Sequence, residues 1–383
     1  MKKIVIAIDS FKGSLTTFDA GSAVADAARE VWGNVEAYVS PIADGGEGTV
    51  DAIISAVKGE RVSVDVCGPL CSKVSARYGY IPATDTAVIE MSAAAGITLV
   101  REEERNPLNT TTYGVGEIII DAISRGCRKF VVGIGGSATN DGGVGMLQAL
   151  GFEFLDANGA PVPLGAKGLK DISSINIKNA LPELKDCTFC VACDVKNVLC
   201  GTDGCSAVYG PQKGATEQMI SDMDAWLGNY ARLTKEVIPT ADENAPGTGA
   251  AGGMGFALLS YLNTTLKSGI ELVMEETKLE EHIQNADLVI TGEGRLDGQS
   301  YMGKAPIGVA KLASKYGVPV VAFSGCVTDD AVVCNDYGID AFFPILRSPC
   351  TLEEAMNTDN AYKNLKDTAC QVFKLINKLK KEI

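Results

Sequence analysis

Short apolar runs that alternate with helical patterns constrain the fold of this chain more than any other feature of its sequence. The runs are rich in β-branched or aromatic residues and are bounded by turn residues, which is typical of buried strands. They are KIVIAI (3–8), KFVVGI (129–134), DLVIT (287–291), VPVVAFS (318–324) and DAFFPI (340–345). Between them, stretches such as TYGVGEIIIDAISRG place apolar residues at helical spacing. The alternation predicts an α/β architecture with a largely parallel sheet.

The pattern changes in the middle of the chain, whose 383 residues suit two domains better than one. The first 60 residues read as strand, helix and strand, and the last 100 continue in the same way. In the middle, RVSVDV and KVSARYGYI alternate polar and apolar residues, as in a sheet with one solvated face. We therefore expect a discontinuous doubly wound domain of residues 1–60 plus 285–383, with a second α/β domain inserted at 61–284.

The formal net charge of −14 argues against nucleic acid as a partner, because no basic stripe is present to neutralise phosphates. A small anionic ligand is still compatible, since one helix N-terminus with one or two cations suffices locally. The apolar run before Asp9 is too short for a signal peptide, and no later run approaches the length of a membrane span. We expect a cytoplasmic protein without a membrane partner, whose twelve cysteines stay reduced.

Polar loops follow the first two predicted strands. IDSFKGSLT (8–16) lies where open α/β folds place their ligands, and Lys12 and Gly13 sit beside a helix start that suits a phosphate. It lacks the Walker A pattern, and an ordinary turn with a surface lysine is the alternative. In PIADGGEGT, Asp44 and Glu47 flank a glycine pair and suit Mg²⁺ or a proton, although DGG is also simply a good turn.

Two Gly-rich segments lead into predicted helices. In GIGGSATNDGGVG (133–145), backbone amides are free to form an anion-binding nest, although the spacing fails the dinucleotide fingerprint. Asp141 within it suits a metal ligand, a base or a helix cap. APGTGAAGGMGF (245–256) is a second such segment, and the pair would suit two anionic groups or one polyphosphate. Close helix packing is the alternative reading of these glycines.

Charged residues gather in two further segments. DLVITGEGRLDGQSYMGKAP (287–306) begins on a strand and is expected to continue as a loop that holds Glu293, Arg295, Asp297 and Lys304. Carboxylates for a metal and cations for a charged substrate occur together there, and a solvated, salt-bridged loop is the alternative. In ERNPLNTTTYG, Arg105 precedes a hydroxyl-rich helix start that suits a carboxylate or phosphate.

Two signals point away from metal clusters and histidine chemistry. Cys187, Cys190 and Cys193 have the spacing of an iron–sulfur run, but the segment reads as a strand, on which Cys190 faces away from the other two. We interpret them as core cysteines. His282, the single histidine, lies in a polar helical stretch and is interpreted as a surface residue. A Ser-His-Asp or Cys-His mechanism is therefore not expected, and any general base is Asp, Glu or Lys.

Taken together and in order, the motifs resemble the bacterial glycerate kinases of the first type. The resemblance covers nearly the whole chain and rests on IDSFKGSL, PIADGGEGT, RNPLNTTTYGVGE, GGSATNDGGVGMLQALG, ACDVKN, GAAGGMGFAL, SGIELV and DLVITGEGRLDGQS with GKAPIGVA. Val198 is a departure, since the family usually has Pro there. The resemblance implies a flavodoxin-like domain, an inserted α/β domain and a cleft between them. It also implies ATP-dependent phosphorylation of D-glycerate, at the 2-hydroxyl in preference to the 3-hydroxyl, which gives 2-phosphoglycerate.

Phosphoryl transfer requires mainly positioning and charge neutralisation, and the motifs offer candidates for each part. The catalytic candidates are Asp194, Lys12 and Asp9, with Asp194 in ACDVKN favoured as the acceptor of the hydroxyl proton over Asp9 or Asp141. Candidates for substrate binding are Arg105, Arg295, Ser10 and Asn197. Candidates for the ATP phosphates are Gly135, Gly136, Ser137, Thr139, Asn140, Gly142, Gly143, Gly252 and Gly253. Candidates for Mg²⁺ are Asp44, Glu47, Glu293 and Asp297.

Two other functions compete with this one. One is a kinase for another small sugar acid, and the other is a non-catalytic sensor or binding protein for a small hydroxy acid. A pure sensor has no evident use for several acidic loops, which favours a kinase. A homodimer is the assembly that we consider, and the sequence alone determines neither this assembly nor the position that is phosphorylated.

Overall fold

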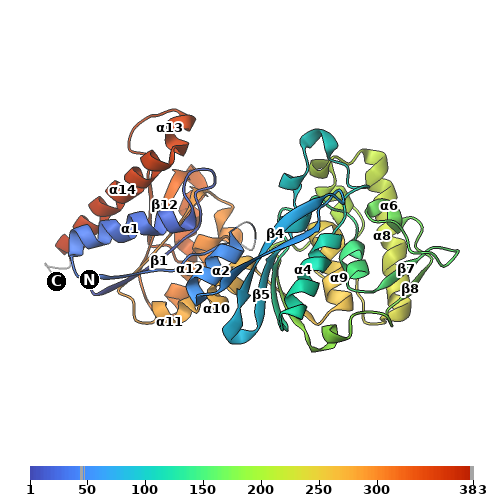
Figure 1. Cartoon of the computed structure of the whole chain (residues 1–383). Helices are drawn as coiled ribbons and strands as arrows, with labels where there is room; N and C mark the ends of the chain where they lie inside the picture. Colours follow the sequence, from blue (N-terminus) through green and yellow to red (C-terminus); the bar gives the residue numbers. More distant parts are fainter. Residues whose placement is uncertain (44–45, 47, 380–383) are drawn as a thin grey trace. The chain divides into compact units, whose positions relative to one another are not determined.

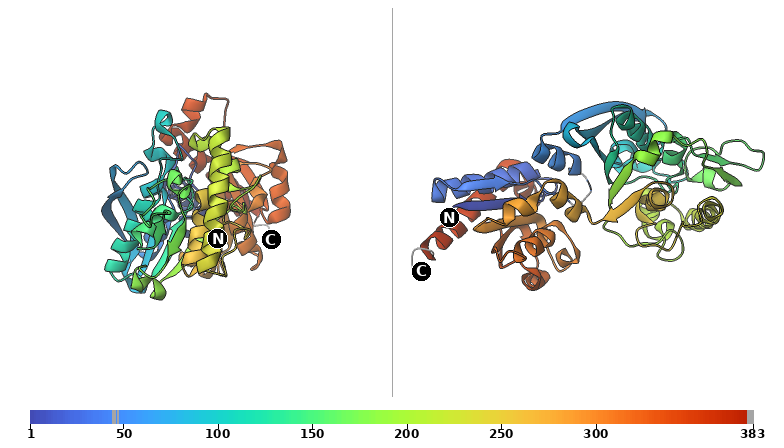
Figure 2. Two further views of the ribbon diagram at one scale, coloured as in Figure 1. Left: turned by 90° about the vertical axis from the view of Figure 1, so that its right-hand side faces the viewer. Right: turned by 90° about the horizontal axis from the view of Figure 1, so that it is seen from below.

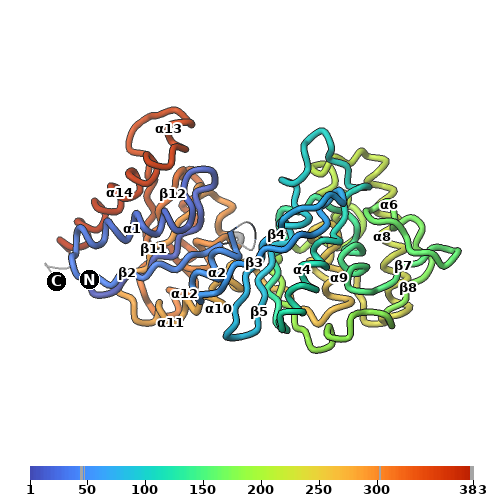
Figure 3. Tube along the Cα trace, in the orientation of Figure 1, coloured from blue at the N-terminus to red at the C-terminus, as the bar shows by residue number. Residues whose placement is uncertain are grey.

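The computed structural model describes residues 1–43, 46 and 48–379, and these residues divide into two compact units. Unit 1 comprises the described residues within Met1–Asp44, Ser55–Val57 and Ile270–Ile383, and unit 2 those within Gly45–Ile54 and Lys58–Gly269. In Figure 3 unit 1 contains both the dark blue N-terminal part and the red C-terminal part of the trace, so the chain leaves this unit and returns to it. The expected domain limits at 60/61 and 284/285 lie later in the sequence, and they stay a prediction, as does the cleft.

Unit 1 is built on a five-stranded sheet in which every neighbouring pair is parallel. The strand order is β13-β12-β11-β1-β2 (Figure 1). Numbered by their order within this unit, the strands run 2-1-3-4-5, which is the flavodoxin-like arrangement. The strands are β1 (Lys3–Ile8), β2 (Glu36–Val39), β11 (Leu288–Leu296), β12 (Val320–Val327) and β13 (Ala341–Pro344). The fold class expected from the sequence is confirmed.

Helices cover the unit 1 sheet because its strands are apolar on both faces. Ile4, Ile6 and Ile8 share one face of β1 and belong to a core cluster with residues of α1 and α14. These two helices lie side by side in Figures 1 and 2. On β1, Val5 and Ala7 are fully buried and project to the opposite face. The helices are α1 (Thr17–Trp32), α10 (Gly269–Glu276), α11 (Leu279–Ile283), α12 (Ala305–Ser314), α13 (Leu352–Met356) and α14 (Thr358–Leu379).

Unit 2 contains a six-stranded mixed sheet with the order β10-β9-β6-β5-β4-β3. Four strands are parallel, while β3 and β4 form an antiparallel pair at one edge. Burial alternates along β3, as expected from the polar–apolar alternation of that region for a sheet with one solvated face. A separate antiparallel pair is formed by β7 and β8. The strands are β3 (Glu60–Cys67), β4 (Lys73–Ile81), β5 (Thr86–Glu90), β6 (Lys129–Gly133), β7 (Glu153–Leu155), β8 (Ser174–Asn176), β9 (Thr188–Ala192) and β10 (Thr264–Lys267).

The helices of unit 2 pack around a core that includes the stacked rings of Phe130 and Phe189, whose centroids lie 4.6 Å apart. They are α3 (Ser92–Ala95), α4 (Tyr113–Ser124), α5 (Val144–Ala149), α6 (Ala166–Leu169), α7 (Cys205–Tyr209), α8 (Glu217–Val237) and α9 (Ala250–Tyr261). The residues of α2 (Thr49–Val57) are divided between the two units. Within the described part of the chain, no helix has the length and apolar character that crossing a membrane requires.

Candidate active site

The carboxyl ends of β1 and β11 meet at the centre of the unit 1 sheet. In a 2-1-3-4-5 sheet the chain connections diverge between these two strands, and ligands bind in the crevice that results. The N–H of Asp9 donates to the carbonyl of Gly292 at 2.9 Å, which extends the β1–β11 ladder by one residue. A Cβ added to Gly294 would lie 3.4 Å from the backbone nitrogen of Lys12, so the loop after β1 lies directly against β11. The IDSFKGSLT and TGEGRLDGQS motifs therefore share one edge.

The strand prediction for 287–291 was too short, and this changes the placement of two site residues. β11 continues to Leu296 because β12 pairs with it throughout, with Glu293 opposite Ser324 and Arg295 opposite Cys326. The expectation that Glu293 and Arg295 lie in a loop is therefore wrong. Residues two apart on a strand project to the same face, so a rigid strand rather than a flexible loop holds these two side chains.

A cluster of two carboxylates, a lysine and a serine lies at this strand end. Ser300 donates its hydroxyl proton to Glu293 Oε1 at 2.7 Å. The ammonium group of Lys304 lies 3.3 Å from Asp297 Oδ1 and 3.7 Å from Glu293 Oε2. Both carboxylates are mostly buried, with side-chain exposures of 12% for Glu293 and 18% for Asp297. Two acids thus converge on one cation in a partly desolvated position.

The two carboxylates of this cluster differ in their proton affinity. Burial raises the pKa of Glu293, although the hydrogen bond from Ser300 and the charges of Lys304 and Lys12 oppose the rise. Burial also acts on Asp297, but the N–H of Gln299 and the charge of Lys304 outweigh it and hold its pKa below the usual value. Asp297 is therefore an anion at neutral pH, whereas the raised pKa of Glu293 means that its carboxylate binds a proton more readily than usual. Neighbouring acids with opposite shifts are typical of functional sites.

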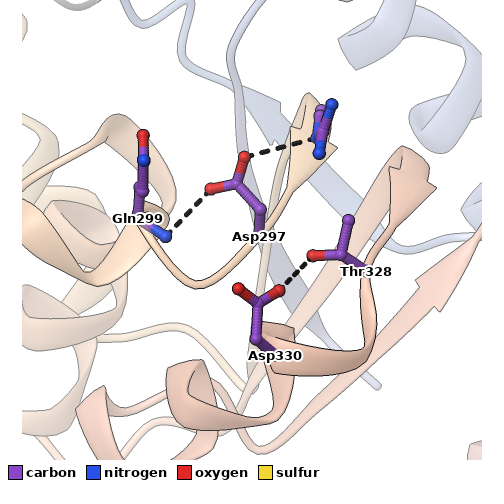
Figure 4. A pocket seen from close by; sticks show the side chains of 5 residues that line it. Asp297, Gln299, Thr328 and Asp330 are labelled. Atoms are coloured by element: carbon purple, nitrogen blue, oxygen red, sulfur yellow. Dashed lines mark hydrogen bonds and ion pairs between the residues drawn. The ribbon is translucent and has the colours of Figure 1, made fainter.

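A pocket of about 500 Å³ opens beside the cluster (Figure 4). This volume is in the range of pockets that hold small molecules. Arg295 Nε lies 3.4 Å from Asp297 Oδ2, and Thr328 donates a hydrogen bond to Asp330. The lining residues are Arg295, Asp297, Gln299, Thr328 and Asp330. Our sequence reasoning missed Thr328 and Asp330, although polar residues directly after the apolar β12 strand carry the same signal as those after β1.

The strand-end carboxylates would suit a magnesium ion that is bound to phosphate oxygens. Among the described residues, no group of three or more His, Cys, Asp and Glu side chains is arranged to hold a metal by itself. The predicted metal ligands Asp44 and Glu47 lie outside the described residues. Glu293 and Asp297 supply two carboxylates around one cationic group. Mg²⁺ bound to substrate phosphates commonly takes only one or two protein carboxylates and keeps several waters.

The start of α1 has the form predicted, and two of its backbone amides already have side-chain partners. Thr16 Oγ1 accepts from the N–H of Asp19 at 3.1 Å, and Asp19 Oδ2 accepts from the N–H of Thr16 at 3.3 Å. This capping box satisfies two of the backbone donors at the helix end. Lys12 is exposed before the helix, and its charge acts on Glu293. The N–H of Ser10 donates to Asp9 Oδ1 at 2.7 Å, while the N–H of Asp9 donates to Gly292, so this loop lies next to the strand that carries Glu293.

In unit 2, the protein's own carboxylate occupies the amide nest of the 133–145 loop. Asp141 is 1% exposed and accepts from Thr112 N at 2.8 Å, Thr112 Oγ1 at 2.9 Å and Gly143 N at 3.2 Å. Burial raises its pKa, and these hydrogen bonds oppose the rise. Of the three roles considered for Asp141, the geometry corresponds to the helix cap. Its enclosure disfavours it as the base.

The two Gly-rich segments pack directly against each other. Gly252 has φ +69°, and a Cβ there would lie 2.1 Å from the carbonyl oxygen of Thr139, while the N–H of Gly142 donates to the carbonyl of Gly252 at 2.9 Å. The buried members of the predicted phosphate site are Thr139, Asn140, Gly142, Gly143, Gly252 and Gly253. Their burial favours the close-packing interpretation, and phosphate binding at them stays a prediction. Gly135 and Gly136 are exposed, and Ser137 follows them at 8% exposure.

The ACDVKN motif begins at the last residue of β9 and contains two predicted site residues, Asp194 and Asn197, which have different surroundings. Asp194 is exposed, and its Oδ1 accepts from the N–H of Gly269 at 3.0 Å. Asn197 Oδ1 accepts a hydrogen bond from the hydroxyl of Tyr209 at 2.7 Å, and Asn197 Nδ2 donates to the carbonyl of Asp203 at 2.9 Å. Both ends of the Asn197 amide are thus engaged locally. The Asp194 carboxylate, in contrast, is accessible to solvent.

A buried lysine in unit 2 was missed by our sequence reasoning. Lys213 is 2% exposed, and its ammonium group lies 2.9 Å from Ser137 Oγ and 2.5 Å from the carbonyl oxygen of Thr139. In the segment PQKG it looks like a surface turn residue, and only the tertiary fold buries it.

His282 was also misjudged, because it is half-buried and stacks on the ring of Tyr38 with centroids 3.5 Å apart.

The sequence and the fold both match known glycerate kinases. A sequence model of the glycerate kinase family matches residues 4–377. The chain is 48% identical to glycerate 2-kinase of Escherichia coli K12 over 95% of both chains, and 44% identical to glycerate kinase of Haemophilus influenzae over 98% of both. The crystal structure of a protein titled putative glycerate kinase 2 from Salmonella typhimurium LT2 superposes with a TM-score of 0.91, covers 99% of both chains and is 44% identical. The chain therefore belongs to the glycerate kinase family.

Proposed function

We propose that this protein transfers the γ-phosphoryl group of ATP to the 2-hydroxyl of D-glycerate and forms 2-phosphoglycerate. The observation that carries the proposal is the 48% identity, over 95% of both chains, to a protein named glycerate 2-kinase. The unit 1 strand edge supports it with a pocket of about 500 Å³, two carboxylates and cationic side chains at the ligand edge of a flavodoxin-like sheet.

The residues of unit 1 suit the charges of phosphoryl transfer. Lys12 and Lys304 carry positive charge beside the strand end and would neutralise phosphate oxygens, in a reaction governed by positioning and electrostatics. Arg295 lines the pocket and offers a planar guanidinium, which suits the carboxylate of glycerate. Glu293 and Asp297 would hold Mg²⁺, which when bound neutralises charge on the phosphates.

The hydroxyl of glycerate must lose a proton as the phosphoryl group is transferred. Asp194 is our proposed acceptor, because its carboxylate is exposed to solvent and is oriented by the N–H of Gly269. Asp9 is the second candidate, since it follows β1 at the strand edge and accepts from the N–H of Ser10. Asp141 is not favoured, because its oxygens are enclosed by backbone and threonine donors.

The decisive experiment measures glycerate-dependent ADP release by the purified chain with ATP and Mg²⁺. Turnover with D-glycerate, and little with other small sugar acids, is the expected result. Proton-coupled ³¹P NMR of the product then distinguishes the positions. A phosphate on the 2-oxygen couples to one proton and gives a doublet, and one on the 3-oxygen couples to two and gives a triplet.

Each alternative has its own outcome in this assay. A kinase for a different sugar acid would release ADP only with that acid. A hydroxy-acid sensor would bind D-glycerate in a calorimeter without releasing ADP. A triplet in the NMR spectrum would replace 2-phosphoglycerate with 3-phosphoglycerate as the product. The cytoplasmic location and the homodimer stay predictions.

A further inference from the structure

The ammonium group of Lys213 lies inside unit 2 with neutral oxygens as its hydrogen-bonding partners. It donates to Ser137 Oγ at 2.9 Å and to the carbonyl oxygen of Thr139 at 2.5 Å. An ammonium group has three N–H donors, so two are used and one remains. Ser137 accepts from Lys213, and among the described residues no acceptor receives its own hydroxyl proton. The pair therefore presents unused donors.

No carboxylate forms an ion pair with Lys213 among the described residues. The Cys205 thiol and Asp141 act on it at longer range, and the Asp141 carboxylate is already bound by Thr112 and Gly143. Burial lowers the pKa of Lys213 to about 8, which still leaves it mostly protonated at pH 7. A buried cation without a counter-ion lowers the stability of the folded state, so the presence of a lysine at this position requires an explanation.

A second cationic side chain comes from the segment that packs beside Lys213. A Cβ on Gly214 would lie 2.2 Å from the carbonyl oxygen of Arg105, so the chain at Arg105 runs directly against the residue after Lys213. The Nε atom of Arg105 is buried and has no hydrogen-bond partner among the described residues. Buried donors are normally satisfied, so this orphaned N–H points to a group that is supplied from outside the chain.

The loop corner that precedes Ser137 is exposed to solvent. Gly135 and Gly136 are exposed and directly adjoin Ser137, which is itself 8% exposed. The corner is fixed, because the carbonyl of Gly136 accepts from the N–H of Ile97 at 2.9 Å. Solvent thus reaches the chain one residue away from the hydroxyl that Lys213 contacts.

We propose that Lys213, Arg105 and Ser137 form an oxyanion-binding subsite in unit 2. The subsite takes one anionic group of a substrate, either the carboxylate of glycerate or a phosphate of the nucleotide. The inference rests on the proposed kinase function for the identity of the ligand, but not for the existence of the subsite. Two cations that form no ion pair with any described residue, together with one hydroxyl, offer the donors that a carboxylate or phosphate requires.

Direct binding to the intact protein tests the proposal without relying on turnover. Dissociation constants for D-glycerate and for ATP are measured separately by calorimetry in the wild type, Lys213→Met and Arg105→Met. Loss of a charge-assisted hydrogen bond should weaken one of the two ligands by about tenfold to a hundredfold and leave the other within about twofold. The ligand that weakens identifies the group that binds. Lys185→Met, an exposed lysine of the same unit, is the matched control and should change neither constant.

Several outcomes would overturn the subsite. The first is that the variants fold and bind both ligands with the same dissociation constants as the wild type. Another is a fall in kcat with both dissociation constants unchanged, which would mean that Lys213 only holds the loop. If Lys213→Met does not fold, Arg105→Met decides, because its guanidinium is not part of the Lys213 hydrogen bonds.

A failure of the kinase assignment is recognised separately. If the wild type binds neither D-glycerate nor ATP, inorganic phosphate becomes the probe at constant ionic strength. Phosphate binding that Arg105→Met weakens at least tenfold would keep the subsite while the proposed function falls. Equal or absent phosphate binding in wild type and variant would remove the subsite as well.

Discussion

The carboxylate of Asp141 accepts a hydrogen bond from the N–H of Gly143, 3.2 Å away, inside the loop whose sequence most resembles a phosphate cradle. An amide nest at a helix start attracts negative charge whatever its source. Here the charge comes from the chain itself, and the nest is closed by the same loop that forms it. The Gly-rich sequence therefore serves close packing at this point, and the exposed corner at Gly135 and Gly136 is the part that remains open.

The contact between the two Gly-rich segments predicts a large loss of stability on adding one methyl group. Gly252→Ala should destabilise the protein by on the order of 3 kcal/mol, because the new Cβ would lie 2.1 Å from the carbonyl oxygen of Thr139 at a φ of +69°. Gly159→Ala is the matched control, with φ +80° and nothing within 4 Å, and should cost about 1 kcal/mol. Urea unfolding measures both, and equal costs would contradict the packing interpretation.

Replacing the proposed base should reduce turnover and leave the fold intact. Asp194→Asn keeps an oxygen that can accept from Gly269 but removes the proton acceptor, so kcat should fall by about a hundredfold or more. Asp203→Asn, an exposed acid in the same region, is the control. Near-normal kcat in Asp194→Asn together with a large loss in Asp9→Asn would move the role to Asp9.

The strand-end cluster predicts a change in magnesium dependence. Glu293→Gln removes one of the two charges beside Lys304, so the Mg²⁺ concentration needed for half-maximal ADP release should rise by about tenfold or more. Titrating Mg²⁺ at fixed ATP measures it, with Glu353→Gln on the exposed face of α13 as the control. An unchanged magnesium requirement would exclude Glu293 as a ligand.

The buried Lys213 predicts a distinctive dependence of stability on pH. Its pKa is lowered by burial to about 8, below the usual 10.5, so between these values the unfolded chain binds more protons than the native chain. The native state therefore gains stability as pH rises from 8 to 10.5, by roughly 3 kcal/mol at about 1.4 kcal/mol for each pH unit. Lys213→Met lacks this gain, whereas Lys185→Met keeps it. Parallel curves of unfolding free energy against pH for wild type and Lys213→Met would contradict the shift.

The fold could be read from the sequence because burial on both faces leaves a strong signal. The apolar runs at 3–8, 318–324 and 340–345 fall on β1, β12 and β13, and the alternating middle region falls on the antiparallel β3 and β4. The end of β11 was placed too early, because Gly292, Glu293 and Gly294 look like a turn. Pairing with β12 overrides that local preference.

The candidate site could be read only in part, because motifs show which residues occur together but not which are enclosed. The segment around Lys12, Glu293 and Asp297 was anticipated, since polar residues after parallel strands meet at one edge. The enclosure of Asp141 and the burial of Lys213 depend on contacts between distant segments. Nothing in the local sequence distinguishes a buried lysine from an exposed one.

The strand order of unit 1 also bears on how the chain is made. β1 needs β11 as its neighbour, yet β1 ends at Ile8 and β11 begins only at Leu288. At ribosomal rates of about 5–20 residues per second, the first strands wait roughly 15–60 seconds for their partner. Throughout that time one edge of β1 is unpaired, while the whole of the other unit is synthesised and can fold. A strand edge without its neighbour can pair with other chains, so this topology leaves β1 open to misassembly until β11 has been made.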